Sequence, residues 1–199
     1  MARVIAIVNQ KGGVGKTTTA VNLAAGLALA GRRVVLIDLD PQGNATTGLG
    51  VSKDGLYPTI YHVILGGESI QSATHWIEAF GLSVIPADID LVGAEIELVG
   101  LDRREYRLKD AIGPRLEQAT HVVIDCPPSL GLLTINALST AGEVIVPLQC
   151  EFYALEGLAH LVRTVSLVRE KLNPYIKVGG IVLTMFDGRT SLAVQIKDE

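Results

Sequence analysis

The sequence of 199 residues has little of what would place it in several broad classes of protein. It has only two cysteines, Cys126 and Cys150, so a disulfide framework is not indicated and a reducing, cytoplasmic setting fits. It has no run of about 18 apolar residues free of polar or charged breaks, so no membrane span is predicted. Its formal net charge is −4, which gives no global attraction to nucleic acid. Any contact with DNA would therefore have to come from a local patch.

What the sequence does have is enough apolar material for a buried core. Hydrophobic residues make up 48% of the chain, and the length predicts a single domain over residues 1–199. Apolar character begins at Val4, so we expect no signal peptide. Short continuous apolar runs are typical of parallel strands buried on both faces. These runs are Val4–Val8, Val34–Ile37, Val122–Ile124, Val144–Pro147 and Ile181–Met185.

Helical patterns lie between these strands. Residues 17–30 are apolar nearly all round, which predicts a buried helix against the sheet, and residues 155–172 carry apolar side chains at helical spacing. The alternation predicts an α/β fold, a doubly wound and mostly parallel sheet with helices on both faces. Residues 52–81 are less regular, and we expect short helices and loops there.

A glycine-rich segment follows the first strand directly: Lys11-Gly12-Gly13-Val14-Gly15-Lys16-Thr17-Thr18. Glycines let backbone N–H groups point at an anion, and a helix that begins here adds the positive end of its dipole. Lys16 can then reach the β- and γ-phosphates, and the Thr17 hydroxyl can ligate Mg²⁺. The segment therefore predicts a P-loop that binds a nucleotide with Mg²⁺.

Two departures from the usual loop stand out. Gln10 occupies the place of the first glycine, and a second lysine, Lys11, begins the loop. One lysine is enough to hold the phosphates of its own nucleotide, so the second could serve a nucleotide on a neighbouring subunit. A cation supplied in trans to phosphoryl transfer is worth about 10³–10⁵ in rate. The alternative for Lys11 is a solvated loop charge.

This loop resembles the deviant Walker A loop of the ParA/MinD ATPase superfamily. Further segments are similar to the chromosomal ParA proteins, often called Soj, and the likeness runs from about residue 2 to residue 197. These segments are Asp38-Leu39-Asp40-Pro41-Gln42-Gly43-Asn44-Ala45-Thr46, Asp125-Cys126-Pro127-Pro128-Ser129-Leu130-Gly131 and Glu151-Phe152-Tyr153-Ala154-Leu155-Glu156-Gly157.

The resemblance implies roles for three aspartates that follow predicted strands. Asp40 would position or activate the attacking water, Asp38 would support the magnesium region, and Asp125 would hold Mg²⁺ from the Walker B position. We therefore expect catalytic Lys11, Lys16 and Asp40, and metal-binding Thr17, Asp38 and Asp125. The alternative is that these aspartates only cap turns or helices. Switch loops sensitive to the γ-phosphate are expected at Asp40, Pro41, Cys126, Pro127 and Pro128.

The resemblance also implies a cellular function. Two subunits would sandwich two ATP molecules, hydrolyse them weakly and bind DNA nonspecifically, with Arg189 at a family position for DNA contact. A ParB-type centromere-binding protein would stimulate hydrolysis and so drive segregation of a chromosome or plasmid, in the cytoplasm and on the nucleoid. A basic cluster at Arg103, Arg104, Arg107 and Lys109 reads better as a solvated helix face.

Two other functions stay open at this point. One is a MinD-like regulatory ATPase at the membrane, which would need an amphipathic C-terminal helix. The other is a truncated nucleotide-binding interaction module without turnover. Family members continue beyond the position of Glu199 with a further strand, a loop that touches the adenine, and basic helices. Without that strand, we expect residues 181–185 to present an exposed apolar edge that invites self-association.

Overall fold

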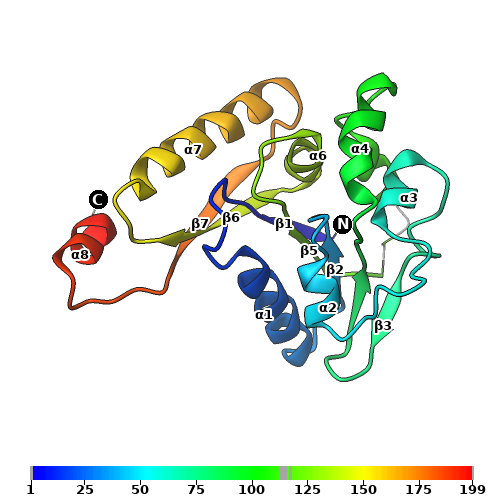
Figure 1. Cartoon of the computed structure of the whole chain (residues 1–199), viewed down its shortest axis with the longest axis horizontal. Coiled ribbons are helices and arrows are strands. Elements are labelled where there is room, and N and C mark those ends of the chain that lie inside the picture. Colours follow the sequence, from blue (N-terminus) through cyan, green and yellow to red (C-terminus); the bar gives the residue numbers. More distant parts are fainter. Residues whose placement is uncertain (1, 113–115, 117, 199) are drawn as a thin grey trace.

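A seven-stranded sheet forms the centre of the computed structural model, which describes residues 2–112, 116 and 118–198 (Figure 1). The strand order is β3-β4-β2-β5-β1-β6-β7, and every neighbouring pair is parallel except β3 with β4. The bounds are β1 Arg3–Ile7, β2 Val34–Asp38, β3 His75–Ile77, β4 Leu82–Ile85, β5 His121–Asp125, β6 Glu143–Gln149 and β7 Lys177–Thr184. The α/β fold with a mostly parallel sheet is confirmed.

Alternate side chains of the central strands enter two different cores, one on each face of the sheet. On β1, Ile5 and Ile7 belong to the core under α1, whereas Ala6 belongs to the larger core on the opposite face. On β2, all five residues of Val34–Asp38 are buried. Continuous apolar runs are therefore required here because both faces are covered.

Helices cover both faces, as the doubly wound pattern predicts. In Figure 1, α1 and α2 lie on one side of the sheet, and α4, α6 and α7 lie on the other. The helices in chain order are α1 Lys16–Leu29, α2 Asn44–Gly48, α3 Ile60–Leu65, α4 Leu91–Glu97, the 3₁₀ helix η1 Leu98–Gly100, α5 Arg107–Ile112, α6 Leu132–Thr140, α7 Ala154–Lys171 and α8 Ser191–Asp198.

Helix α1 is less buried than its composition predicts. Only Lys16, Ala20 and Ala24 are fully buried, and Leu29 is 78% exposed. The helix forms the outer layer on its side of the sheet, so small alanines face the strands while the opposite side stays open. The expectation of burial all round was wrong for this reason.

Residues 52–81, which have no regular pattern, contain one strand that the sequence does not reveal. The expected short helix is present as α3, but the expectation of helices and loops alone over residues 52–81 was wrong, because β3 lies there and pairs antiparallel with β4. β3 has only three residues, none of them buried. So short a strand leaves no alternating pattern to detect.

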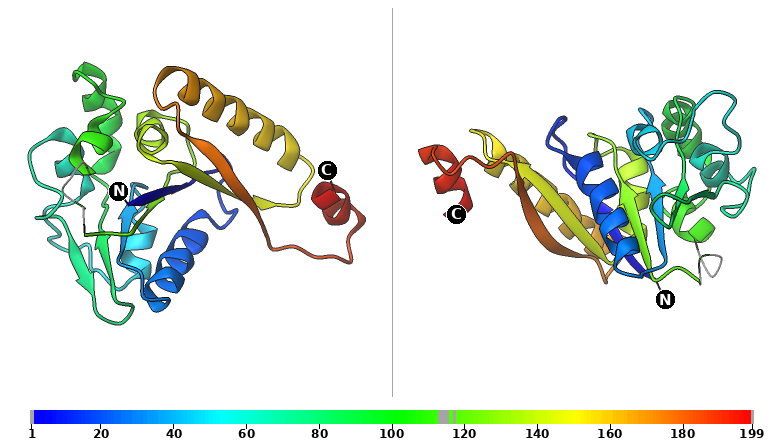
Figure 2. Two further views of the ribbon diagram at one scale, coloured as in Figure 1. Left: turned by 180° about the vertical axis from the view of Figure 1, so that it is seen from behind. Right: turned by 90° about the horizontal axis from the view of Figure 1, so that it is seen from below.

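At the opposite end of the sheet, β7 is the edge strand, and its first six residues are exposed. Ile181 and Val182 remain 45% and 39% exposed, which confirms the exposed apolar edge. Helix α8 follows on a long loop and packs against the first turn of α7, where Ile196 shares a small buried cluster with Ala154 (Figure 2).

Candidate functional site

The predicted site residues converge at the carboxyl ends of the three central strands. The P-loop follows β1, Asp38 ends β2 and Asp125 ends β5. The sheet register places Asp125 beside Ile7 on one side and beside Asp38 on the other. In open α/β sheets this edge is where ligands bind.

Two glycines give the P-loop its shape. Gly13 and Gly15 have φ angles of 74° and 85°, a region that glycine adopts without steric cost. Helix α1 begins directly after Gly15, whose carbonyl accepts a hydrogen bond from the Thr19 N–H at 2.9 Å. The loop therefore ends on a helix N-terminus, as a phosphate site requires.

Lys16 lies inside this loop. The residue is only 7% exposed, and its Nζ donates a hydrogen bond to the Lys11 carbonyl at 2.9 Å. Burial lowers the pKa of Lys16, while the carboxylates of Asp125 and Asp40 act in the opposite direction. An ammonium group is thus held beside two carboxylates, with a single carbonyl as its hydrogen-bond acceptor among the described residues.

In the described part of the chain, the carboxylate of Asp125 is left without a hydrogen bond of normal geometry, although the Thr17 hydroxyl lies near enough to act on it as a donor. The residue is fully buried, and neither carboxylate oxygen has a hydrogen-bond partner among the described residues. Burial first, and then the charge of Asp38, raise its pKa to about 7, although the nearby Thr17 hydroxyl acts to lower it. An orphaned carboxylate of this kind is costly unless a cation or a donor completes it.

Asp38 differs from Asp125 because both of its carboxylate oxygens already accept hydrogen bonds from the protein. Its Oδ2 accepts hydrogen bonds from the N–H and hydroxyl of Thr46 at 2.8 and 2.7 Å, and its Oδ1 accepts one from the Asp40 N–H at 3.2 Å. Burial nevertheless raises the pKa of Asp38 to about 6. This carboxylate fixes the turn after β2, which positions Asp40.

Asp40 stands at the head of that turn. Its Oδ1 accepts a hydrogen bond from the Gln42 N–H at 2.9 Å, and its carbonyl accepts one from the Gly43 N–H at 2.8 Å, across Pro41. Gly43 has a φ of 58°, and a Cβ there would lie 2.6 Å from the Ala87 carbonyl. The turn is therefore closely packed as well as hydrogen-bonded.

The second switch segment, residues 126–131, follows β5 and begins beside the end of β1, from which the P-loop starts. The Cys126 N–H donates to the Ile7 carbonyl at 3.3 Å, and the thiol is fully buried. Burial raises the pKa of Cys126 well above its ordinary value, so the group stays a neutral thiol. Pro127 and Pro128 follow, and the segment ends at Gly131, where a Cβ would overlap the Glu95 carboxylate of α4.

Lys11 lies at the outer mouth of the loop and is paired within its own chain. Its ammonium group forms an ion pair with Glu151, which lies 140 residues away in the sequence on the segment after β6. The side chains are 49% and 44% exposed. Lys11 is therefore a solvent-accessible cation held by one carboxylate.

Sequence reasoning gave no role to two residues that contact the P-loop. The Thr184 hydroxyl, at the end of β7, donates to the Val14 carbonyl at 2.9 Å, and Glu151 pairs with Lys11. Both contacts join segments far apart in the chain. The signal that could have found Glu151 is its place at the start of one of the segments that are similar to the ParA proteins.

The proposed DNA contact and the basic cluster lie away from this site. Arg189 is exposed, and its guanidinium donates three hydrogen bonds to the carboxylate of Asp187, two residues earlier in the loop before α8. Arg103 and Arg104 precede α5 and pair with Asp110 and Glu105. Most of these charges are thus already neutralised locally.

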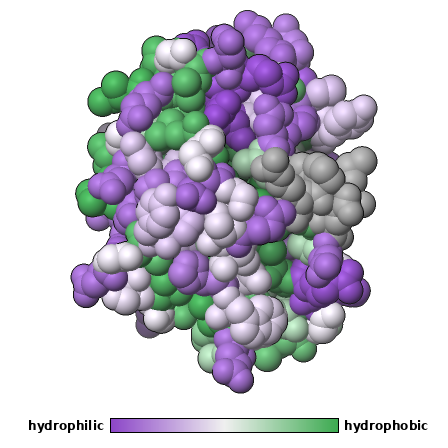
Figure 3. Space-filling model, turned by 90° about the vertical axis from the view of Figure 1, so that its right-hand side faces the viewer, coloured by the Kyte–Doolittle hydropathy of each residue, from purple (hydrophilic) through white to green (hydrophobic). Residues whose placement is uncertain are grey.

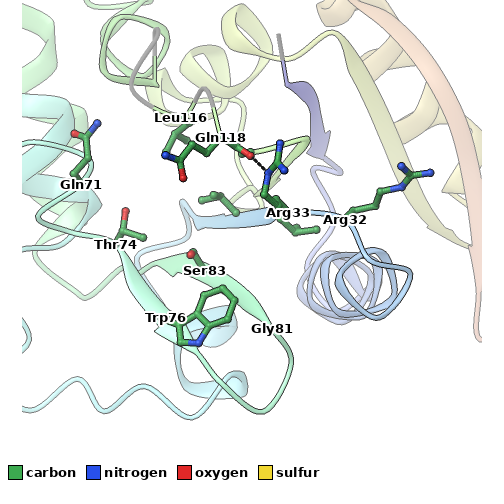
Figure 4. Close-up of a pocket in the computed structure, with 12 residues that line it drawn as sticks. Arg32, Arg33, Gln71, Thr74, Trp76, Gly81, Ser83, Leu116 and Gln118 are labelled. Carbon is green, nitrogen blue, oxygen red and sulfur yellow. Dashed lines mark hydrogen bonds between the residues drawn. The ribbon is translucent and has the colours of Figure 1, made fainter.

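A cavity on another side of the molecule is a separate feature. It measures about 860 Å³ and is lined by Arg32, Arg33, Trp76, Ser83 and Gln118, among others. Figure 4 shows Arg33 reaching the Gln118 carbonyl across it. Most of the lining residues lie at the amino ends of β2, β4 and β5, the edge opposite to the P-loop, and Trp76 comes from β3.

No group of three or more His, Cys, Asp or Glu side chains in the described ranges could hold a metal ion alone. Mg²⁺ usually keeps several waters and takes only one or two carboxylates beside substrate phosphates. The orphaned oxygens of Asp125 and the hydroxyl of Thr17 fit that mode of binding. No helix in the described residues is both long and apolar enough to cross a membrane.

Fold and site together define a P-loop protein for nucleoside triphosphates, with an additional lysine at the start of its loop. A family model described as an AAA domain matches residues 2–178. The chain is 55% identical to the chromosome partitioning protein ParA of Myxococcus xanthus, over 100% of this chain and 70% of that relative. It is 51% identical to the sporulation initiation inhibitor protein Soj of Bacillus subtilis, over 100% and 79%. The chain therefore belongs to the ParA/Soj family of chromosome-partitioning ATPases.

A solved structure agrees with this architecture over the whole chain. It is named cobyrinic acid a,c-diamide synthase from Mycobacterium smegmatis, with bound ADP and magnesium. The TM-score is 0.94 at 44% identity, covering 100% of this chain and 82% of that one. The fold is thus that of a protein crystallised with a nucleotide and magnesium.

Proposed function

We propose that this chain is a slow, Mg²⁺-dependent ATPase of the ParA type that works as a switch between monomer and dimer. The observation that carries the proposal is the buried, unpartnered carboxylate of Asp125 behind the P-loop, next to Lys16. A site built only for structure would pair that carboxylate. The ADP and magnesium of the related solved structure support the same reading.

In this proposal Mg²⁺ would be held by the Thr17 hydroxyl and, through water, by Asp125. The ion would bridge the phosphates and neutralise charge that develops during transfer. Lys16 and the loop Gly12–Thr18 would bind the phosphates. Asp40 would orient the attacking water, and the hydrogen bonds from Thr46 to Asp38 would keep that turn in place.

Lys11 is the residue that would join two subunits into a dimer. Its amine is half exposed at the mouth of the loop, so it can reach a phosphate on a second copy once it leaves Glu151. Each subunit would offer its lysine to the nucleotide of the other, closing a sandwich around two ATP molecules. A monomer would lack that cation and would hydrolyse ATP very slowly.

The cellular role follows from the family. The ATP dimer would bind DNA nonspecifically on the nucleoid, with Arg189 among the contacts, and a ParB-type partner would stimulate hydrolysis during segregation. Phosphate contacts would dominate, so DNA binding should weaken steeply with salt. Arg189 would have to exchange Asp187 for a phosphate.

The test is phosphate release with Mg²⁺ and ATP, with Lys16→Gln as the background. Release above that background supports the ATPase, and Asp40→Ala should bind ATP while abolishing release. Release equal to the Lys16→Gln background, with nucleotide still bound, would instead indicate a binding module without turnover. Pelleting with liposomes in the presence of ATP would indicate the MinD-like alternative.

A further inference from the structure

Helix α4 and its 3₁₀ extension carry a second apolar face that no described element covers. Their inward face is buried through Leu91, Ala94 and Leu98. Three large apolar residues on their outward side, and Ile89 in the turn that leads into α4, are exposed: Ile89 is 63%, Val92 54%, Ile96 77% and Val99 57% exposed. We call these four residues the α4 stripe.

The spacing of the α4 stripe is that of a helix–helix seam. Its members are separated by three, four and three residues, as a and d positions are in a heptad. Singly scattered apolar residues on a surface need no explanation, but a continuous exposed stripe marks an interaction site. An α-helix is the partner element that matches such a seam.

The charged residues beside the stripe indicate which charge a partner helix must carry. Residues 88–102 contain five acidic residues and no lysine or arginine, the acids being Asp88, Asp90, Glu95, Glu97 and Asp102. Among the described residues, none of the five forms an ion pair. Glu95 is turned inward against Gly131, which leaves four acids beside the stripe, and Glu97 accepts a hydrogen bond from the Tyr61 hydroxyl. Arg104, whose guanidinium donates to the Val99 carbonyl, is paired with Glu105. Complementarity therefore requires lysine or arginine beside the apolar seam of the partner.

The stripe lies on a separate side of the molecule from β7 and α8. Figure 1 places α4 and the last described residues at opposite ends of the sheet. Figure 3, which views the side where α3 and α4 lie, shows apolar side chains next to strongly hydrophilic ones. A docked helix would therefore leave the other end of the molecule free.

We propose that the α4 stripe is the docking surface for a basic amphipathic helix of a partner protein. A second copy of this chain is disfavoured, because pairing two stripes would bring the acidic residues beside them, such as Asp90 and Glu97, against their own counterparts. An anionic membrane surface is disfavoured by the same negative charge. The proposal does not depend on nucleotide turnover.

The position of the stripe also brings the partner close to the nucleotide switch. Glu95 lies on α4, and its carboxylate occupies the space that a Cβ on Gly131 would need. Gly131 closes the segment that begins at Asp125 and is the N-cap of α6. A helix on the outer face of α4 would thus lie across α4 from the contact between Glu95 and the switch segment.

The test uses a designed probe and the protein without nucleotide. The probe is a fluorescent three-heptad peptide with leucine at a and d and lysine at e and g, and its twin has glutamate in place of lysine. We expect micromolar binding of the lysine peptide by fluorescence anisotropy, weakened by salt, and no binding of the glutamate peptide. Ile96→Ser and Val92→Ser should each weaken binding by about tenfold.

The control is Leu29→Ser, which removes a leucine of equal exposure from the end of α1 and should leave binding unchanged. Thermal melts establish that each variant is folded. The double variant Asp90→Asn with Asp102→Asn should reduce the salt dependence while keeping the apolar contact. Failure of the lysine peptide to bind, equal binding of the glutamate peptide, or equal losses in Ile96→Ser and Leu29→Ser would each overturn the proposal. Because ATP is absent, these results are independent of whether the chain hydrolyses it.

Discussion

The P-loop region has an inner part around Lys16 and Asp125 and an outer part around Lys11 and Glu151. The two parts differ in whether their charged side chains have partners within the chain. In the inner part, Lys16 and Asp125 are buried, and Asp125 has no hydrogen-bond partner among the described residues. In the outer part, Lys11 and Glu151 are half exposed and fully paired with each other. Of the two lysines, five positions apart in one loop, Lys16 is therefore buried beside an unpaired carboxylate, and Lys11 is exposed and paired.

The difference separates binding from assembly. A buried, unpaired carboxylate gains most from a cation that arrives with the nucleotide, so the inner part is suited to bind MgATP within one chain. An exposed ion pair contributes little to stability and can open at small cost. The outer part is therefore suited to release Lys11 to a second molecule.

Removal of the outer lysine should have the largest effect on turnover. In Lys11→Ala we expect phosphate release to fall by about 10³-fold or to background, because the cation in trans is lost. Nucleotide affinity should stay unchanged, since Lys16 and the loop backbone remain. Titration with a fluorescent ATP analogue beside a phosphate-release assay checks both halves. A parallel loss of affinity would show that Lys11 belongs to the inner part.

Removal of the inner lysine should act on affinity instead. In Lys16→Gln we expect ATP binding to weaken by about a hundredfold, because a charge-assisted contact to the phosphates is lost from a partly desolvated site. The same titration measures the change, with a thermal melt to establish folding. Full affinity in this variant would contradict the assignment of Lys16.

Asp125 allows the inner part to be tested without nucleotide. Its pKa is raised from 3.8 to about 7, so the folded state holds the proton more tightly than the unfolded chain does. The stability of the wild type therefore falls as the pH rises from about 4 to about 7, and stays at the lower level above that range. Asp125→Asn avoids the cost of the buried charge.

We expect Asp125→Asn without Mg²⁺ to be more stable than the wild type by about 2–4 kcal/mol near pH 8, with the advantage shrinking towards about pH 4. Urea unfolding at several pH values measures the difference. The same variant should lose the effect of Mg²⁺ on nucleotide affinity. An advantage independent of pH would show that the carboxylate is not the group responsible.

The smallest predicted effect concerns the carboxylate that holds the outer lysine. In the proposed dimer, each subunit must first break its own ion pair between Lys11 and Glu151, so two pairs are broken in total. Glu151→Gln removes these pairs and therefore removes their cost to dimerisation. An exposed pair is worth about 0.2–1 kcal/mol, so dimerisation with an ATP analogue should strengthen by between about twofold and about thirtyfold.

The matched control for this variant is Glu156→Gln, an exposed acid in the first turn of α7. It should leave dimerisation unchanged. Sedimentation velocity over a dilution series measures both variants. Weaker dimerisation in Glu151→Gln would mean that Glu151 supports the dimer and does not restrain Lys11.

Much of the fold could be predicted because both faces of the central sheet are covered. Continuous apolar runs mark β1, β2, β5, β6 and part of β7, and their alternation with helices predicts the doubly wound class but not the order of the strands. β4, at Leu82–Ile85, was not predicted, because Ser83 interrupts its short apolar run. β3 escaped because its three residues are partly exposed. The N-terminal half of β7 escaped because Gly179 and Gly180 interrupt its apolar pattern.

In the site, the sequence placed the P-loop and the three aspartates at strand ends, and the structure brings them together. It could not distinguish Asp38 from Asp125, because the hydrogen bonds from Thr46 that complete Asp38 depend on the path of the following turn. Nor could it reveal the pairing of Lys11 with Glu151, which depends on the neighbouring positions of β1 and β6 in the sheet.

The most direct test of the account is the mass of the protein in solution with a non-hydrolysable ATP analogue and Mg²⁺, compared with ADP. The account predicts about 42 kDa for the wild type with the analogue, twice the chain mass of 21.1 kDa, and the mass of one chain with ADP. It predicts the mass of one chain for Lys11→Ala with either nucleotide. A wild type that stays monomeric with the analogue, or a Lys11→Ala variant that dimerises as well as the wild type, would contradict it.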